Sequence, residues 1–349
     1  MTTFHRIQFD DSRQLVNVDT ECVDLVVTSP PYPMIAIWDE MFGELNLDIA
    51  AALAELDADR AFELMHRELD QTWHQVFRVL KPGGMACINI GDAVRTNNDR
   101  FALYPNHARI LNALTQAGLT ALPGILWRKQ TNAPNKFMGS GMLPPGAYAT
   151  LEHEYILVFR KEPRRNFSTA AQKRNRGASA FFWEERNLWF SDLWTDLKGT
   201  SQVLDAQNAR SRSAAFPFEL PYRLINMFSV KGDTVLDPFA GTGTTMYAAM
   251  AAGRSSIMVE KDTALRAAVL SRTDRIVPEA NVRIGNRLDN HLRFVSERKR
   301  NRAPLKHTNS FYGFPVVTRQ EVRLVLDRLE KLENSTDDLL LVHYAAMGL

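Results

Sequence analysis

Apolar residues in this chain form short runs that are separated by longer amphipathic segments. Six runs have the length of buried strands and lie at residues 23–27, 84–90, 124–127, 154–159, 234–237 and 255–260. Segments with apolar residues at the spacing of helices lie at residues 61–80, 103–118, 219–229 and 244–253. Strands that alternate with helices predict an α/β fold with a mostly parallel sheet. Ligands of such folds bind beyond the carboxyl ends of the strands.

Two regions depart from this alternation. Residues 161–215 are polar and basic with interspersed aromatic residues, which indicates an insertion rather than part of the sheet. Beyond about residue 291 the chain is basic and then contains proline, and its pattern predicts a helix at residues 320–333. We therefore expect four parts: the first half of an α/β domain (1–160), the insertion (161–215), the second half (216–290) and a C-terminal extension (291–349).

The composition of the 349 residues is that of a globular protein, with 45% hydrophobic and 23% charged residues. No apolar run approaches the roughly twenty residues of a membrane span, and the amino terminus lacks the features of a signal peptide. Only two cysteines are present, Cys22 and Cys87, so we expect no disulfide framework and a cytoplasmic location. The eight histidines lack the spacing of metal ligands, and we expect no metal site. The net charge of +2 does not by itself indicate a nucleic-acid binder.

A glycine-rich turn follows the predicted strand at 234–237, in the sequence "TVLDPFAGTGTT". Gly241 and Gly243 allow the backbone to approach a ligand closely, and the next helix begins with free N–H groups. About twenty residues later Glu260 ends another predicted strand, where its carboxylate can accept hydrogen bonds from both hydroxyls of a ribose. The turn lacks the lysine of a phosphate loop and the three-glycine spacing of a dinucleotide site. These features favour S-adenosylmethionine, which has a ribose and no pyrophosphate, as the cofactor.

A second turn follows the first predicted strand, in "VVTSPPYP" (26–33). Pro30 and Pro31 stiffen this turn and contribute carbonyl acceptors without N–H donors. The Ser29 hydroxyl and the Pro30 carbonyl can then accept the two hydrogens of an exocyclic base amine and orient its nitrogen toward a sulfonium methyl group. Tyr32 can stack on the base, which reaches such a pocket only by leaving the duplex. The alternative is a proline-rich surface turn with a packed tyrosine.

Both turns resemble motifs of the DNA amino-methyltransferases, which modify cytosine N4 or adenine N6. In this chain "TSPPYP" precedes "DPFAGTGTT", which is the circularly permuted order of the β class. The resemblance extends from about residue 7 to residue 270 and includes "LKPGGMACINIGD", "WRKQTNAPNKF", "HEYILVFRK" and "FPFELPYRLINMFS". It implies a Rossmann-like methyltransferase fold with a mostly parallel seven-stranded sheet, helices on both faces and S-adenosylmethionine at the strand ends.

The resemblance also implies the residues of the site. Its catalytic residues are Ser29, Pro30, Pro31 and Tyr32. Its cofactor site is lined by Asp237, Phe239, Ala240, Gly241, Thr242, Gly243 and Glu260, with Phe216 and Pro217 near the methionine end. Asp11 is an implied contact to the cofactor adenine, but Asp10 stands where the family has glycine, and a solvated turn carboxylate is the alternative. Phe239 is either a wall of this site or a core aromatic residue.

Contacts to DNA are expected in two regions. The family places contacts to the flipped base after the strand that ends at Trp127, so we expect Trp127 or Phe137 near the base and Lys136 near a phosphate. The alternative is a surface loop with one packed tryptophan. The insertion is the candidate target-recognition region, with basic residues that could neutralise phosphates or form a solvated face. These residues are Arg164, Arg165, Lys173, Arg174 and Arg176. Asp92 either faces the base pocket or caps a turn or helix.

Serine before Pro-Pro is typical of the N4-cytosine members of the family, whereas aspartate or asparagine is typical of adenine enzymes. We therefore predict a DNA methyltransferase that modifies cytosine N4 in double-stranded DNA, with adenine N6 as the second choice. A non-catalytic DNA-binding protein is disfavoured by the intact motifs, and a small-molecule or protein methyltransferase by the basic insertion. The sequence does not decide whether a cognate restriction endonuclease exists or whether the protein is a monomer or a homodimer. It also leaves the DNA recognition sequence open.

Overall fold

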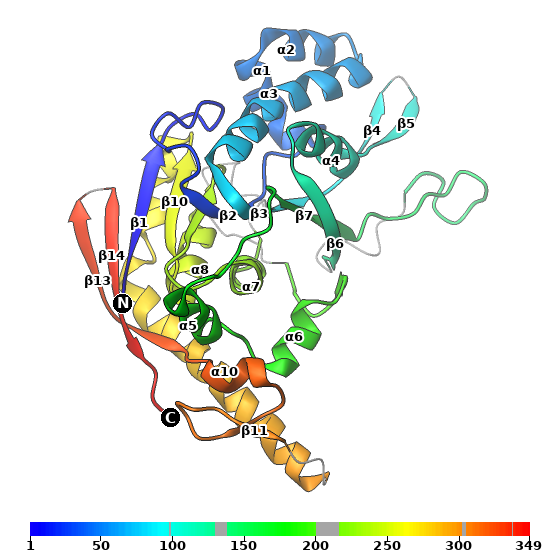
Figure 1. Ribbon diagram of the computed structural model, residues 1–349. Coiled ribbons are helices and arrows are strands. Elements are labelled where there is room, and N and C mark those ends of the chain that lie inside the picture. The colour runs from blue at the N-terminus through cyan, green and yellow to red at the C-terminus, as the bar shows by residue number, and fades with distance from the viewer. Residues whose placement is uncertain (98, 130–137, 200–215, 302–304, 337) are drawn as a thin grey trace.

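One large sheet organises the molecule (Figure 1). The computed structural model describes residues 1–97, 99–129, 138–199, 216–301, 305–336 and 338–349. Within them the sheet has ten strands in the order β13-β14-β1-β10-β9-β2-β3-β7-β6-β8. Their bounds are β1 (Thr2–Phe9), β2 (Val23–Thr28), β3 (Leu80–Ile90), β6 (Thr120–Arg128), β7 (His153–Arg160), β8 (Leu193–Trp194), β9 (Thr234–Asp237), β10 (Ser255–Glu260), β13 (Asp327–Thr336) and β14 (Leu339–Ala346). Two small pairs lie outside it, β4 (Ala93–Asn97) with β5 (Arg100–Tyr104) and β11 (His307–Thr308) with β12 (Pro315–Val316).

All six predicted strands are present, and the sheet is mostly parallel as predicted. Strands β1, β10, β9, β2 and β3 run parallel, and β7 is antiparallel to both of its neighbours, β3 and β6. The seven adjacent strands from β1 to β6 form the sheet that the family resemblance implies. The complete sheet is wider, because β8 pairs with β6 at one edge and β14 pairs with β1 at the other.

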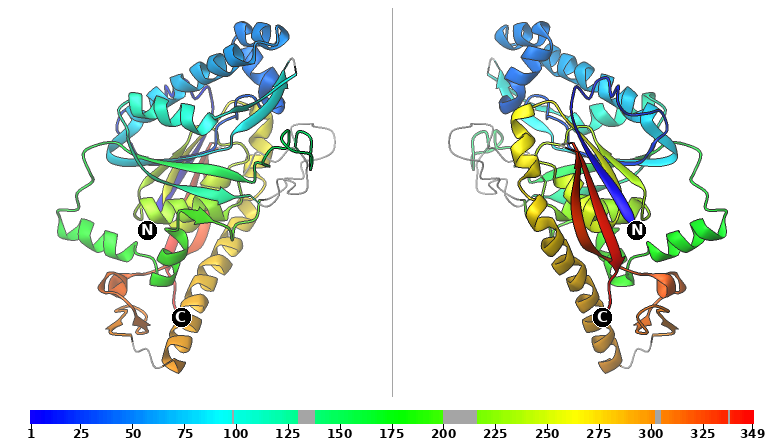
Figure 2. Two further views of the ribbon diagram at one scale, coloured as in Figure 1. Left: turned by 90° about the vertical axis from the view of Figure 1, so that its right-hand side faces the viewer. Right: turned by 90° about the vertical axis from the view of Figure 1, so that its left-hand side faces the viewer.

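Helices cover both faces of the sheet, which explains why β2 is buried along its whole length. On one face, side chains such as Val26 and Leu236 pack with α3 (Ala58–Val79) and α4 (Asn106–Gln116). On the other face, Val27 and Val235 pack with α7 (Glu219–Phe228), α8 (Thr244–Ala252) and α10 (Thr273–Arg300). Figure 2 shows α10 running along one side of the molecule and past the end of the sheet. The shorter helices are α1 (Asp39–Leu45), α2 (Leu47–Ala54), α5 (Ala170–Ala178), α6 (Trp183–Trp189) and α9 (Arg266–Leu270).

The C-terminal extension differs from its predicted form. The helix predicted at 320–333 is wrong: Arg319–Arg323 forms one short 3₁₀ helix, and β13 begins at Asp327. Leu329 is buried beside α10, and β13 pairs with β14, which adds this hairpin to the edge of the sheet. Such long-range pairing overrides a local helical spacing. The expected boundary at residue 290 is also not a break in the fold, because α10 continues through it.

The order of the strands reverses between β9 and β2. From β9 the chain passes through α8 to β10 on one side, and from β2 it passes through α3 to β3 on the other side. Ligands of open α/β sheets bind beyond the carboxyl ends of the strands at such a reversal. Both turns singled out in the sequence follow these two strands. Among the described residues, no helix is both long and apolar enough to cross a membrane.

Candidate active site

The two turns meet at the carboxyl ends of β2 and β9, as the sequence analysis requires. These strands are parallel neighbours, with Val26 paired to Leu236. At their ends the Thr28 hydroxyl donates a hydrogen bond of 2.5 Å to Oδ1 of Asp237. Ser29 follows Thr28 directly, and the glycine turn follows Asp237. We call the turn after β2 (residues 29–33) the catalytic turn and the turn after β9 (residues 238–243) the cofactor turn. The two turns are therefore joined by a buried side-chain hydrogen bond.

Asp237 connects the two turns through several hydrogen bonds. Its carboxylate also accepts hydrogen bonds from the Thr245 hydroxyl (2.6 Å) and from the backbone N–H of Phe239 (3.1 Å). Burial raises the pKa of Asp237 to about 6, because desolvation outweighs the donors that stabilise its charge. Asp237 thus fixes the start of the glycine turn and the end of β2 at the same time.

The glycine turn has open space and carboxylate acceptors at the place where the sequence predicts the ribose of S-adenosylmethionine. Gly241 and Gly243 have positive φ values of 52° and 77°, and a side chain at Gly241 would meet no atom within 4 Å. Glu260 lies beside the turn, where Oε2 accepts a hydrogen bond from Gly241 N (2.7 Å) and Oε1 accepts one from Asp262 N (2.9 Å). Each carboxylate oxygen can accept a further hydrogen bond, as a ribose diol requires. Desolvation raises the pKa of Glu260.

The remaining predicted cofactor residues lie around the same edge. Phe239 is half-buried and packs edge-on against Trp73, with 6.0 Å between ring centroids, so it has both a core contact and some exposed surface. Ala240 is buried and Thr242 is half-buried within the turn. Phe216 and Pro217 are buried directly before α7.

Asp11 lies in the loop after β1, close to the cofactor turn because Phe9 pairs with Glu260 in the sheet. Its carboxylate forms an ion pair with Arg13 (2.7 Å), and Arg13 also contacts Glu68 (2.6 Å). Burial opposes ionisation, but the hydrogen bonds from Arg13 outweigh it and lower the pKa of Asp11. Asp11 is therefore a partly exposed turn carboxylate that Arg13 holds beside the cofactor turn, and its contact to the cofactor adenine stays a prediction.

The catalytic turn rests on a buried polar cluster. The Ser29 hydroxyl donates to the Tyr32 hydroxyl (3.1 Å), which donates to Oε2 of Glu154 (2.9 Å). Asn89 near the end of β3 also contacts Tyr32, because its Nδ2 donates to the Tyr32 hydroxyl (2.9 Å). Gly91 follows β3 directly, and a Cβ at this position would lie 3.0 Å from the Tyr32 ring. Burial and the nearby Glu154 raise the pKa of Tyr32 well above 10, so Tyr32 stays protonated.

Sequence reasoning missed Glu154 and Asn89 as members of this cluster. Both side chains are buried, with exposed fractions of 5% and 2%. The available signal was a carboxylate and an amide within apolar strand-like runs, "HEYILVF" and "ACINI". Buried charges need a partner, and such residues therefore mark a site or a structural network.

Trp127 lies in the core rather than on a DNA-facing surface. Its side chain has no exposed area, and its Nε1 donates to the carbonyl oxygen of Leu197 (3.0 Å). The packed-tryptophan alternative therefore describes it, because an enclosed ring has no surface for a base in this conformation. Lys136 and Phe137 fall outside the described residues.

Residues 164–176, the basic part of the insertion, lie at the amino ends of the parallel strands, opposite the catalytic turn (Figure 1). We call this end of the sheet the amino-terminal edge. Arg165 forms an ion pair with Asp233 (2.6 Å), the residue before β9, and lies 3.6 Å from Asp24 near the start of β2. Helix α5, which carries Lys173, Arg174 and Arg176, contacts the loop before β9 through Asn175. These residues lie away from the base pocket because β7 runs antiparallel and ends at the amino ends of the neighbouring parallel strands. Their contacts with DNA phosphates stay a prediction.

Arg164 is exposed next to Arg165 at this edge. The guanidinium groups of Arg165 and Arg176 both lie over the ring of Phe167, each 4.8 Å from its centroid. The cationic groups of this region are thus partly used to hold the insertion to the amino-terminal edge.

Asp92 caps α4. It accepts hydrogen bonds from the backbone N–H of His107 (3.1 Å) and from His107 Nδ1 (2.8 Å). The cap alternative for Asp92 is therefore present in the structure.

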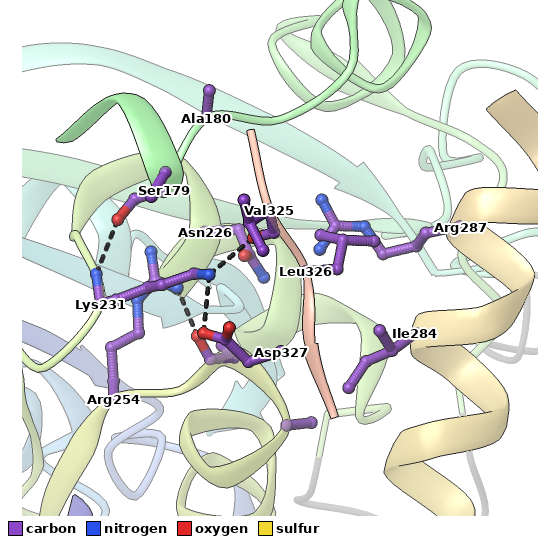
Figure 3. Close-up of a pocket in the computed structure, with 13 residues that line it drawn as sticks. Ser179, Ala180, Asn226, Lys231, Arg254, Ile284, Arg287, Val325, Leu326 and Asp327 are labelled. Carbon is purple, nitrogen blue, oxygen red and sulfur yellow. Dashed lines mark hydrogen bonds and ion pairs between the residues drawn. The ribbon is translucent and has the colours of Figure 1, made fainter. Parts of the chain in front are cut away.

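One small cavity among the described residues is remote from both turns (Figure 3). It has a volume of about 20 Å³, roughly the space of one water molecule. Lys231 is one of its polar lining residues, and its Nζ donates to the carbonyl oxygen of Val325 (2.6 Å) and pairs with Asp327 (2.6 Å). This cavity lies where the C-terminal hairpin joins the core. Among the described residues there is no cluster of side chains suited to a metal ion.

The fold and the site together define an S-adenosylmethionine-dependent methyltransferase. The family model described as DNA methylase, of the N6/N4 type, matches residues 23–269. The chain belongs to this family, its activity is that of an N6/N4-type DNA methyltransferase acting on double-stranded DNA, and its cofactor is S-adenosyl-L-methionine.

Two archaeal relatives are similar over most of the chain. One is the type II methyltransferase M.MthZI of Methanothermobacter thermautotrophicus, 50% identical over 339 residues, which cover 96% of this chain and 94% of the relative. The other is M.MjaI of Methanocaldococcus jannaschii, 48% identical over 277 residues, which cover 76% and 90%.

Solved structures share the fold. TTHA0409 of Thermus thermophilus, in complex with S-adenosyl-L-methionine, is 33% identical with a TM-score of 0.61 and covers 78% of this chain and 95% of its own. The cytosine-N4-specific PvuII DNA methyltransferase is 18% identical with a TM-score of 0.50, covering 79% and 90%, and supports the fold alone.

Proposed function

We propose that this enzyme transfers the methyl group to the exocyclic N4 amine of a cytosine that has left the DNA duplex. The observation that carries the proposal is the position of Ser29. It begins a Ser-Pro-Pro-Tyr turn that is held against the cofactor turn by the Thr28–Asp237 hydrogen bond. A neutral hydroxyl at this position is typical of the N4-cytosine members of the family.

The residues of the chain divide the work of a direct transfer. Glu260 and the glycine turn hold the ribose of the cofactor, which supplies an electrophilic sulfonium methyl group. Ser29 Oγ and the Pro30 carbonyl accept the hydrogens of the amine and orient the nitrogen lone pair toward the methyl group. Tyr32 stacks on the flipped base. No covalent intermediate is needed, since the amine is itself the nucleophile: the new N–C bond would form as the S–C bond of the cofactor breaks, S-adenosylhomocysteine would leave, and the amine would lose one proton to water.

The names of the archaeal relatives support a biological setting. M.MthZI and M.MjaI are both named type II methyltransferases. We therefore place this enzyme in a restriction–modification system, where a cognate endonuclease cuts the same sequence when it is unmethylated.

Mass spectrometry of nucleosides tests the choice of base. DNA from cells that express the wild-type protein is expected to contain N4-methylcytosine, and DNA from cells that express Ser29→Ala is expected to contain far less. N6-methyladenine in place of N4-methylcytosine would transfer the proposal to adenine. Neither product, together with failure of the purified protein to label DNA, would indicate a DNA-binding protein without turnover.

Kinetics of Ser29→Ala test the role of the hydroxyl. We expect kcat to fall much more than the affinity for S-adenosylmethionine, because Ser29 faces the base rather than the cofactor. An equal loss in kcat and in cofactor affinity would remove Ser29 from the catalytic role.

A further inference from the structure

A chain of hydrogen bonds extends from the catalytic serine into the sheet. It begins at Ser29 after β2, passes through the hydroxyl of Tyr32 and reaches Glu154 in β7. Lys129, directly after β6, closes the chain, with its Nζ 2.8 Å from Oε1 of Glu154. Asn89 in β3 donates both to the Tyr32 hydroxyl (2.9 Å) and to Oε2 of Glu154 (2.6 Å). Four neighbouring strands thus contribute to one polar cluster.

The number of available hydrogen atoms determines which group is the donor in each of these hydrogen bonds. Glu154, paired with the Lys129 ammonium group, offers only acceptor oxygens. The Asn89 amide must direct its nitrogen to the cluster, because its oxygen would otherwise lie 2.6 Å from a carboxylate oxygen. The single hydrogen of the Tyr32 hydroxyl is then donated to Glu154.

This arrangement of donors determines whether the Ser29 hydroxyl donates or accepts. Since the only hydrogen of the Tyr32 hydroxyl is used, its 3.1 Å contact with Ser29 requires Ser29 to be the donor. The hydroxyl hydrogen of Ser29 is then directed away from the base site, and its oxygen offers lone pairs alone. An isolated serine hydroxyl could rotate and donate to a base as readily as it accepts.

We propose that Glu154 and Asn89 are positioning residues that make Ser29 an obligate hydrogen-bond acceptor for the target amine. This inference rests on the proposed function, in which Ser29 accepts a hydrogen of an exocyclic amine. Lys129 supports it by balancing the buried charge of Glu154, whose side chain is only 6% exposed. The cluster explains how a serine can do the work that a carboxylate or amide oxygen does in other family members.

Replacement of Glu154 by glutamine tests the proposal. The amide introduced by Glu154→Gln can donate to the Tyr32 hydroxyl. The Tyr32 hydroxyl can then donate its own hydrogen to Ser29, so that Ser29 is no longer the donor in this pair. We expect kcat to fall by about 10- to 100-fold, as for the loss of one hydrogen bond to a charged group. The Kd for S-adenosylmethionine is expected to stay close to the wild type, whereas the unfolding midpoint is expected to fall, because the buried Lys129 ammonium group loses its charged partner. Tyr32→Phe, which keeps the ring and removes the link, provides a second variant with the same expected direction.

Matched controls lie far from the site. Glu185→Gln alters a carboxylate that is paired with Arg287 (2.6 Å), and Tyr344→Phe removes a buried hydroxyl that donates to the carbonyl oxygen of Met250 (2.8 Å). Both controls are expected to keep the wild-type kcat. If they lose as much activity as Glu154→Gln and Tyr32→Phe, the effect is general destabilisation and the proposal is wrong.

A double-mutant cycle separates positioning from a purely structural role. If Glu154 acts through Ser29, Glu154→Gln reduces kcat little or not at all in the Ser29→Ala background. Additive losses would overturn the positioning role. Wild-type kcat in Glu154→Gln together with a defective Ser29→Ala would overturn this inference and leave the proposed function intact. Full activity of Ser29→Ala, or methylation of adenine alone, would instead reject the proposed function.

Discussion

The hydrogen bond between Thr28 and Asp237 is the contact that joins the catalytic and cofactor turns, and its removal gives a quantitative prediction. Thr28→Val keeps the size and branching of the side chain and deletes the hydroxyl. Thr28 has no exposed surface and Asp237 is 1% exposed, so water does not replace the lost donor without rearrangement. We expect the variant to be less stable than the wild type.

The size of the loss depends on pH, because Asp237 titrates with a pKa of about 6. A hydrogen bond to an ionised group contributes about 1.5–3 kcal/mol, and one to a neutral group about 0.5–1.5 kcal/mol. We therefore expect a loss of about 2 kcal/mol at pH 8 and about 1 kcal/mol at pH 5.

The sign follows from linkage. A carboxyl group whose folded pKa is raised stabilises the fold most at low pH, and this contribution is lost as pH rises from the unfolded pKa through the folded one. Deletion of a donor raises the pKa of Asp237 further. The free energy of unfolding of the wild type stops falling above about pH 6, whereas that of the variant keeps falling up to its own, higher pKa. The difference between the two proteins must therefore grow as pH rises through about 6.

Urea unfolding at pH 5 and pH 8 measures this difference. Thr72→Val is the matched control, since Thr72 is 1% exposed and its hydroxyl contacts the neutral hydroxyl of Ser12, at 3.3 Å. Its loss is expected to be about 1 kcal/mol or less at both pH values. Equal losses for Thr28→Val at pH 5 and pH 8, or a larger loss at pH 5, would show that the Thr28 hydroxyl does not stabilise the ionised carboxylate of Asp237.

Three further variants test other parts of the account. Gly91→Ala places a Cβ 3.0 Å from the ring of Tyr32, so kcat is expected to fall with little change in cofactor Kd; an unchanged kcat would show that the ring position is not critical. Glu260→Gln removes an acceptor for the ribose and is expected to weaken binding of S-adenosylmethionine by about tenfold or more in calorimetry; an unchanged Kd would place the ribose elsewhere. Simultaneous replacement of Lys173 and Arg174 by alanine is expected to leave DNA affinity within about twofold at fixed salt, and a large loss would show that DNA reaches the amino-terminal edge.

The sequence predicted the central strands because their burial on both faces produces continuous apolar runs. It did not reveal β1, whose inward positions include Thr3 and His5. His5 is buried with its Nδ1 2.9 Å from the Ser256 hydroxyl, and burial lowers its pKa to about 3, so a neutral histidine takes a core position that a hydropathy pattern cannot detect. For β13 the local spacing indicated a helix, and only the pairing with β14 made it a strand.

The candidate site could likewise be predicted from the sequence only in part. Its two turns are local motifs, and their adjacency follows from the general rule that parallel strands end at one edge. The support beneath Tyr32 comes from Asn89 in β3, Glu154 in β7 and Lys129 directly after β6, and only the tertiary structure brings them together. The edge at which the insertion emerges depends on the direction of β7, which an apolar run does not encode.

The most direct test of the account uses purified protein, double-stranded DNA that contains many sequences, and S-adenosylmethionine labelled with ¹³C at its methyl group. After digestion to nucleosides, mass spectrometry identifies the labelled base. The account predicts that the label enters N4-methylcytosine and that Ser29→Ala strongly reduces it. Label found in 5-methylcytosine, or in no nucleoside although the cofactor binds, would contradict a site in which two turns bring an exocyclic amine to the methyl group.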